Sequence, residues 1–224
     1  MGYPRSVTIK LAAASVNNIA QSQTPGGAGA LTLNGSAVSS GVAILDVARR
    51  VLITPAANET GHNFVVTGKD REGNVISETL AGTNATAFYT VQDYLQVTSV
   101  TISAAATGAI QVGTNGVAST KWFLLDYDIA NFNVGLYVDI QGGTVNLDWQ
   151  VTPDEIDMTK GPALPNPVAF TPPTPFGVAN GTGLSATGYI GTTIPARAVR
   201  ALINSGSTTV NGTKFTILQS GLQD

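Results

Sequence analysis

Short runs of alternating apolar and polar residues, separated by turn-forming residues, recur along most of this 224-residue chain. Residues 64–68 and 75–80 are predicted to be partner strands on either side of a charged turn at 70–74, and residues 97–103 alternate. A period of two residues places successive side chains on opposite faces of a strand, and closely spaced turn signals are typical of a sandwich or barrel. The sequence therefore predicts an all-β protein, an antiparallel β-sandwich or a jelly-roll-like fold.

Residues 42–53 fit two different structures. Apolar residues fall there at helical spacing, but the same stretch also fits two short strands. We favour a strand over residues 49–54, because β-branched residues and the following Pro55 oppose the continuation of a helix.

The second half of the chain offers two candidate hairpins. Residues 134–140 and 144–151 alternate on either side of a Gly-Gly pair, which is a favourable hairpin turn. Residues 198–204 and 214–219 are predicted to form a terminal strand pair joined by a Ser/Thr/Asn/Gly turn.

A proline-rich stretch at residues 162–176 interrupts this pattern, and a glycine-rich stretch of small residues follows it. Proline cannot donate to a β-ladder and favours extended chain, so we expect a long Pro/Gly-rich extended arm. The predicted organisation is a main β-sandwich domain over 1–160, the arm over 161–191, and a terminal β-hairpin over 192–224 that returns to the β-domain.

Charged residues make up only 11% of the chain, whereas about 25% is usual in soluble proteins. Neutral polar residues repel one another weakly, so we expect other subunits to cover much of the surface; the alternative is an ordinary β-domain with a Thr-rich exterior. The 11 Lys and Arg residues do not outnumber the 14 Asp and Glu residues, which argues against nucleic acid as a partner. The sequence also contains no apolar run long enough to span a bilayer and no visible secretory signal.

The sequence contains few residues that could carry out enzymatic chemistry. The chain has no Cys, one His and no Gly-x-Ser-x-Gly motif, so neither a nucleophilic triad nor a zinc site is expected. His62 is predicted to be a surface or turn residue. We expect no catalytic residue, no cofactor and no enzymatic activity.

Carboxylates provide the remaining chemical possibility. Two of them share one face of a predicted strand, and two others on following strands could approach them: Asp126, Asp128, Asp139 and Asp148. Such a group could bind calcium or supply the acid and base of a glycosidase, but the calcium-loop pattern is missing. We favour a solvated face of an antiparallel sheet with no metal, and we interpret Trp122 and Trp149 as core or interface anchors rather than sugar-stacking residues.

Two blocks of the sequence resemble known proteins. The first block combines strand-like segments with turns: RVLIT at 50–54, NFVVTG at 63–68, DREGN at 70–74, ISETL at 76–80, VTSVTI at 97–102 and GAIQVGT at 108–114. It is similar to a β-rich block of structural proteins in tailed-bacteriophage virions. The terminal segments 197–206 and 215–219 are similar to closing hairpins of such proteins.

The resemblance implies a non-enzymatic virion structural protein. We favour a capsid decoration or cement protein on the capsid surface that stabilises the head shell. It would form a homo-oligomer, with a trimer as the working hypothesis, and bind the major capsid protein or other virion subunits. The expected contact residues lie near the N-terminus and in the arm: Tyr3, Arg5, Pro165, Phe170, Pro172, Pro173 and Phe176. The alternatives are a neck, collar or tail structural component, and a carbohydrate-binding or carbohydrate-acting β-module.

Overall fold

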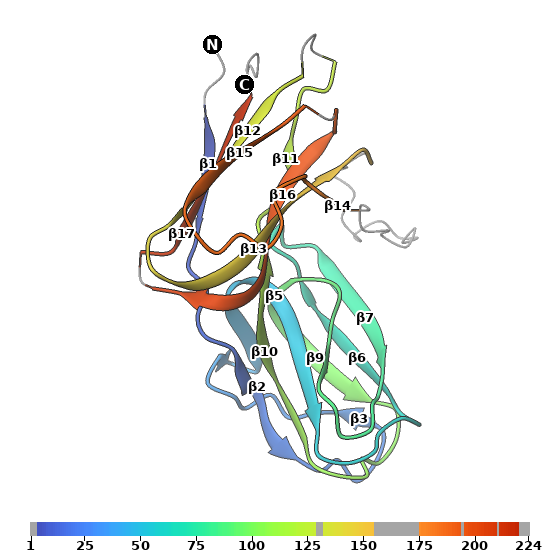
Figure 1. Cartoon of the computed structure of the whole chain (residues 1–224). Coiled ribbons are helices and arrows are strands. Elements are labelled where there is room, and N and C mark those ends of the chain that lie inside the picture. The colour runs from blue at the N-terminus through green and yellow to red at the C-terminus, as the bar shows by residue number, and fades with distance from the viewer. Residues whose placement is uncertain (1–3, 129–131, 155–174, 194, 210, 220–224) are drawn as a thin grey trace. The chain divides into compact units, whose positions relative to one another are not determined.

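A computed structural model describes residues 4–128, 132–154, 175–193, 195–209 and 211–219 (Figure 1). The described residues form antiparallel β-sheets and contain no helix, which confirms the predicted all-β sandwich class. They divide into two compact units. Of the described residues, unit 1 contains those up to Ala12 and those from Val117 onward, and unit 2 contains Ala13–Gly116.

This division differs from the predicted single β-domain over 1–160. The reason lies in long-range pairing, because strand β1 (Arg5–Ile9) pairs along its length with strand β17 (Thr213–Gln219). The two ends of the chain therefore belong to one unit, and unit 2 is an insertion between them. Among the described residues, no helix is both long and apolar enough to cross a membrane.

Unit 2 is built around a sheet in which β10, β5, β9, β6 and β7 are successive neighbours, with short strands added at its margins. Its strands are β2 (Ser15–Gln23), β3 (Gly29–Ala30), β4 (Val38–Ser39), β5 (Val42–Pro55), β6 (Asn63–Lys69), β7 (Val75–Ala81), β8 (Phe88–Tyr89), β9 (Tyr94–Ile102) and β10 (Ile110–Ser119), whose last residues enter unit 1.

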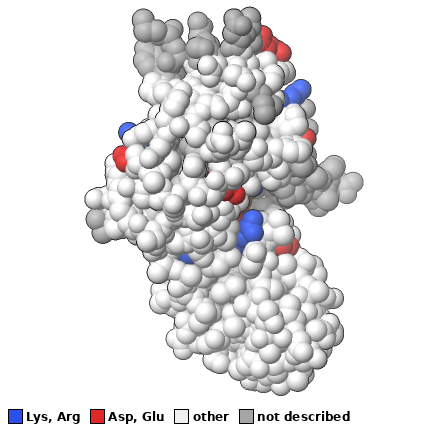
Figure 2. Space-filling view, viewed as in Figure 1, with Lys and Arg blue, Asp and Glu red and all other residues white. Residues whose placement is uncertain are grey.

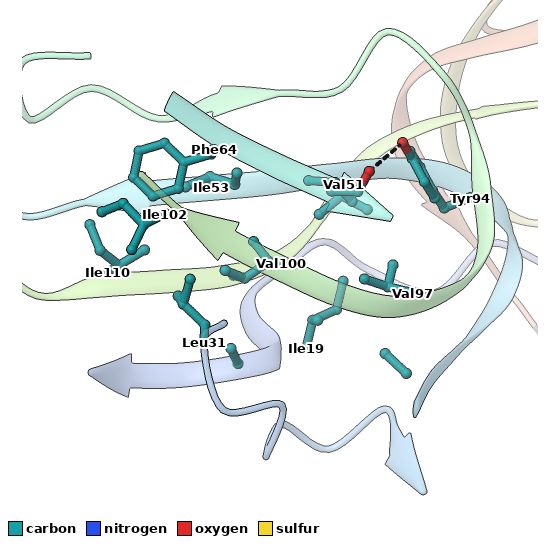
Figure 3. Close-up of a cluster of buried hydrophobic side chains, with 14 of the residues drawn as sticks. Ile19, Leu31, Val51, Ile53, Phe64, Tyr94, Val97, Val100, Ile102 and Ile110 are labelled. Atoms are coloured by element: carbon teal, nitrogen blue, oxygen red, sulfur yellow. Dashed lines mark hydrogen bonds between the residues drawn. The ribbon is translucent and has the colours of Figure 1, made fainter. Parts of the chain in front are cut away.

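The core of unit 2 consists mainly of side chains from β2, β5, β6, β9 and β10, together with Leu31 after β3 and Ile76 of β7 (Figure 3). Phe64 is fully buried and packs edge-to-face against Phe88 at a centroid distance of 5.4 Å. The Tyr94 hydroxyl donates a hydrogen bond of 3.1 Å to the carbonyl of Val66, drawn as the dashed line in Figure 3. Burial, and secondarily the charge of Glu78, raises the pKa of Tyr94 above its ordinary value. Tyr94 is therefore a neutral core residue.

Local sequence patterns account well for this part of the chain. The β6–β7 hairpin has the predicted strands and turn, and its turn is closed by a 2.8 Å hydrogen bond from the Asn74 amide to Asp70 Oδ1. Gly73 adopts a φ of 88°, a conformation that favours glycine. The ambiguous stretch 42–53 lies in one long strand, β5, so the preference for a strand is confirmed and its length was underestimated.

Unit 1 contains two sheets. Sheet A has the order β1-β17-β12-β15, and the strands of unit 1 outside it, here called sheet B, follow the order β14-β13-β16 with β11 also paired to β16. The remaining bounds are β11 (Phe123–Leu124), β12 (Val134–Ile140), β13 (Gly143–Thr152), β14 (Phe176–Gly177), β15 (Gly188–Thr192) and β16 (Ala198–Thr208). Trp149 of β13 packs edge-to-face on Phe215 of β17, 5.6 Å away, so the two sheets share a core.

Both predicted hairpins in this unit are wrong in their pairing, although their strands are present. Strand β12 pairs with β15 and β17 in sheet A, whereas β13 pairs with β14 and β16 in sheet B. Likewise, β16 and β17 lie in different sheets. Each glycine-containing turn therefore carries the chain from one sheet to the other. The two crossings contact each other, because the Thr209 hydroxyl donates to the carbonyl of Gln141 at 3.3 Å.

The predicted arm over 161–191 is only partly described. Residues 161–174 lie outside the described chain, but the rest of the stretch is not an arm. Residues 176–184 follow the edge of β13, where the Val178 amide donates to the carbonyl of Trp149 at 2.9 Å. Strand β15 then pairs with β12 in sheet A. Glycines permit these contacts, since a Cβ at Gly181 would lie 2.5 Å from Ile190.

Candidate interaction surface

Residues 121–127, with the sequence KWFLLDY, form a surface segment at the edge of sheet B in unit 1. Strand β11 within it pairs with the start of β16, with Leu124 opposite Ala198. Side chains alternate along the segment: Phe123 and Leu125 are buried, whereas Leu124 is 45% exposed. We call residues 121–127 the aromatic segment.

Cationic side chains cover the rings of the aromatic segment. The guanidinium of Arg200 lies 4.6 Å from the centre of the Trp122 ring, and that of Arg197 lies 4.8 Å from the Tyr127 ring. A planar guanidinium stacks on an aromatic face and remains charged, which an ammonium group does less well. Each pair contributes about 0.5–1 kcal/mol at an exposed position and holds its ring in one orientation.

Arg200 connects the segment to the rest of sheet B. Its Nε donates a 2.9 Å hydrogen bond to Oε1 of Gln150, which lies opposite it on β13. The next residue across the sheet is Gly177 of β14. The result is a continuous row of Trp122, Arg200, Gln150 and Gly177, in which the guanidinium contacts a ring on one side and an amide on the other.

Two side chains from sheet A fix the main chain of the aromatic segment. Gln219, 3% exposed, donates through Nε2 to the Asp126 carbonyl at 2.7 Å and accepts from the Asp126 amide at 3.0 Å. Arg5 of β1 donates to the carbonyl of Leu124 at 3.3 Å. The segment is therefore positioned before any partner binds, which reduces the entropy that association must overcome.

The predicted contact residues can be placed only in part. Arg5 contacts the aromatic segment, and Phe176 on the edge strand β14 is 54% exposed. The other predicted contact residues lie outside the described chain: Tyr3, Pro165, Phe170, Pro172 and Pro173.

The four candidate carboxylates do not form a common site. Asp126 and Asp128 follow β11 rather than sharing a strand, because β11 ends at Leu124. Asp139 lies on β12 of sheet A, whereas Asp148 lies on β13 of sheet B and accepts a 2.7 Å hydrogen bond from the Gly183 amide. Within the described part of the chain, no group of three or more His, Cys, Asp or Glu residues could hold a metal ion. The shared acidic face expected from the sequence is thus not present.

The two tryptophans have different roles. Trp149 is fully buried in the core of unit 1, as an anchor residue would be, and Trp122 is half-buried beneath Arg200. Trp149 therefore offers no surface for a sugar, and Arg200 covers one face of Trp122.

A polar centre in unit 2 was missed by the sequence analysis. Glu59 is fully buried, and its Oε1 accepts hydrogen bonds from the amides of Thr107 at 2.8 Å and Gly108 at 3.0 Å. Its Oε2 lies 2.5 Å from Nδ1 of His62, whose side chain is 18% exposed. His62 is in a turn, as predicted, but its ring contacts the buried Glu59 carboxylate, which also binds the main chain of a neighbouring loop. No local sequence signal distinguishes this glutamate from one on the surface.

Charged side chains are sparse on the face of the molecule shown in Figure 2.

Comparisons of the chain with protein-family models, curated proteins and solved structures find no match. The function of the chain is therefore inferred from its own residues and their contacts.

Proposed function

We propose that the protein is a non-enzymatic structural component of a tailed-bacteriophage virion, acting as a decoration or cement protein that stabilises the head shell. The observation that carries the proposal is the aromatic segment with its stacked arginines. Trp, Tyr and Arg are the residues most enriched at the energetic centres of protein interfaces, whereas lysine and acidic residues are depleted there. The resemblance of residues 50–114 to virion proteins supports the class of assembly.

The partner in this proposal is the major capsid protein or another virion subunit. Leu124 and Tyr127, 45% and 43% exposed, offer apolar area that a partner would remove from water. Arg197 lies beside them, with its planar guanidinium over the Tyr127 ring. A homo-oligomer, with the trimer as the working hypothesis, would present several such surfaces at once, so that weak contacts add up through effective concentration.

A neck, collar or tail location is the alternative, because the same surface would serve there. Quantitative mass spectrometry of purified particles distinguishes the two. A copy number comparable to that of the major capsid protein supports decoration, and a far lower number supports the neck or tail. Absence of the protein from washed particles would refute the virion assignment.

Variants test the contact surface directly. We expect Trp122→Ala combined with Arg200→Ala to abolish binding to particles that lack the protein, measured by co-sedimentation. The matched control is Tyr89→Ala with Arg50→Ala in unit 2, where Arg50 lies 5.4 Å from the Tyr89 ring. Equal binding by both double variants would show that the aromatic segment is not part of the interface.

A further inference from the structure

The outward face of sheet A carries a tyrosine in an unusual position. Tyr189 of the edge strand β15 is 62% exposed, yet its ring lies across Gly135 of the neighbouring strand β12. A Cβ on Gly135 would lie 2.6 Å from the Tyr189 hydroxyl oxygen and 2.9 Å from Cε2. The missing side chain therefore lets the ring rest against the sheet and present its exposed surface to solvent.

A second ring and a polar group follow along the same face. Tyr137 lies directly opposite Tyr189, and Asp139 lies two residues farther along β12. Because Val134, Leu136 and Val138 are fully buried, the side chains of Tyr137 and Asp139 point away from the core. From Gly135, which Tyr189 covers, to Asp139 the distance along the strand is about 14 Å.

The carboxylate at the end of this face is held in place by neutral groups. Oδ2 of Asp139 accepts a 2.8 Å hydrogen bond from Nε2 of Gln141, and the Thr187 hydroxyl lies 3.5 Å from Oδ1. Lys214 lies opposite Asp139 in the β12–β17 ladder, so a basic group balances this acidic group among the described residues of the face. The same face also carries Leu218, which lies opposite Gly135 and is 43% exposed, and the neutral polar Thr216, which lies opposite Tyr137.

From this arrangement we infer that the outward face of sheet A is a binding site for a neutral oligosaccharide, with Tyr189 as its stacking platform. The C–H groups on one face of a sugar ring carry partial positive charge and pack against the negative face of an aromatic ring. Sugar hydroxyls both donate and accept, which matches a fixed carboxylate–amide pair beside threonine hydroxyls. A face whose charges balance favours an uncharged ligand over an anionic one. This site is distinct from the aromatic segment and would add an attachment function to the structural one.

Affinity electrophoresis of the full chain tests the inference, using native gels that contain dextran, mannan or a soluble β-glucan, with polygalacturonate as the anionic control. We expect retardation by at least one neutral polysaccharide and none by polygalacturonate. Tyr189→Ala should weaken binding roughly tenfold or more, because it removes the stacking surface. Tyr189→Phe keeps the ring and should retain most of the binding, and Asp139→Asn should weaken it. The matched control is Tyr89→Ala, which removes a tyrosine of 47% exposure from unit 2.

Migration unaffected by all three neutral polysaccharides would overturn the inference, as would equal retardation of Tyr189→Ala and the unmodified protein. Loss of particle binding in Tyr189→Ala without any polysaccharide binding would overturn it too, and would assign this face to a protein partner. The proposed virion role is tested separately by particle co-sedimentation of the aromatic-segment variants, so either proposal can fail alone.

Discussion

Replacement of Glu59 by alanine is expected to destabilise unit 2 strongly, because this buried carboxylate has three polar partners. The substitution leaves the amides of Thr107 and Gly108 without their acceptor and removes the hydrogen-bond partner of the His62 ring. Leaving a buried hydrogen-bonding group without its partner costs about 1–3 kcal/mol. Because two amides lose the same acceptor, we expect a loss of about 2–4 kcal/mol in the free energy of unfolding.

Urea denaturation followed by far-UV circular dichroism measures this loss, and amide hydrogen exchange locates it. The amides of Thr107 and Gly108 should lose protection more than amides in unit 1. Glu59→Gln retains a carbonyl oxygen as acceptor, so its loss should be clearly smaller. Glu72→Ala makes the same change in an exposed turn and should shift stability by less than about 0.5 kcal/mol. Equal denaturation midpoints for Glu59→Ala and Glu72→Ala, with unchanged protection at Thr107 and Gly108, would refute the reasoning.

Three further substitutions probe the packing of each unit by urea denaturation. Tyr94→Phe removes a buried hydroxyl that bonds a backbone carbonyl of β6 and should cost about 1 kcal/mol; no change would mean that the bond adds nothing. Trp149→Ala opens a cavity in the core of unit 1 and should cost about 3–5 kcal/mol, so a near-neutral result would contradict the shared core of its sheets. Gly82→Ala places a Cβ 2.2 Å from the Glu59 carbonyl and should destabilise unit 2, whereas Gly61→Ala meets nothing within 4 Å and should be tolerated; equal effects would refute the close contact.

The sequence was sufficient where structure depends on nearby residues. The β6–β7 hairpin combines clear alternation with a turn in which Asp70, Gly73 and Asn74 each have a local role. The same kind of local pattern was misleading at Gly142 and Gly143. Their φ angles of 124° and 91° suit a tight turn, but such a turn can join two paired strands or carry the chain to an opposing sheet. Only the long-range partners of each strand decide between these outcomes.

The candidate interaction surface was not predicted from the sequence, which placed the contact residues near the N-terminus and in the arm. Of those residues, Arg5 contacts the aromatic segment. The stacking of Arg200 on Trp122 depends on the register between β11 and β16, which lie far apart in sequence. Contact residues in the proline-rich stretch were inferred from composition alone; of these, Phe176 is described and exposed, and Pro165, Phe170, Pro172 and Pro173 lie outside the described chain.

The chain has few charged residues, and in unit 1 neighbouring groups fix the orientation of exposed aromatic rings. On the aromatic segment, guanidinium groups hold Trp122 and Tyr127, and on sheet A the bare backbone of Gly135 receives the ring of Tyr189. A ring that is already ordered loses little conformational entropy when a ligand covers it, so more of the contact energy is retained as affinity. A flexible charged side chain would instead lose rotamer freedom and hydration on binding. Preorganised aromatic groups can therefore supply affinity and orientation on a surface with few charges.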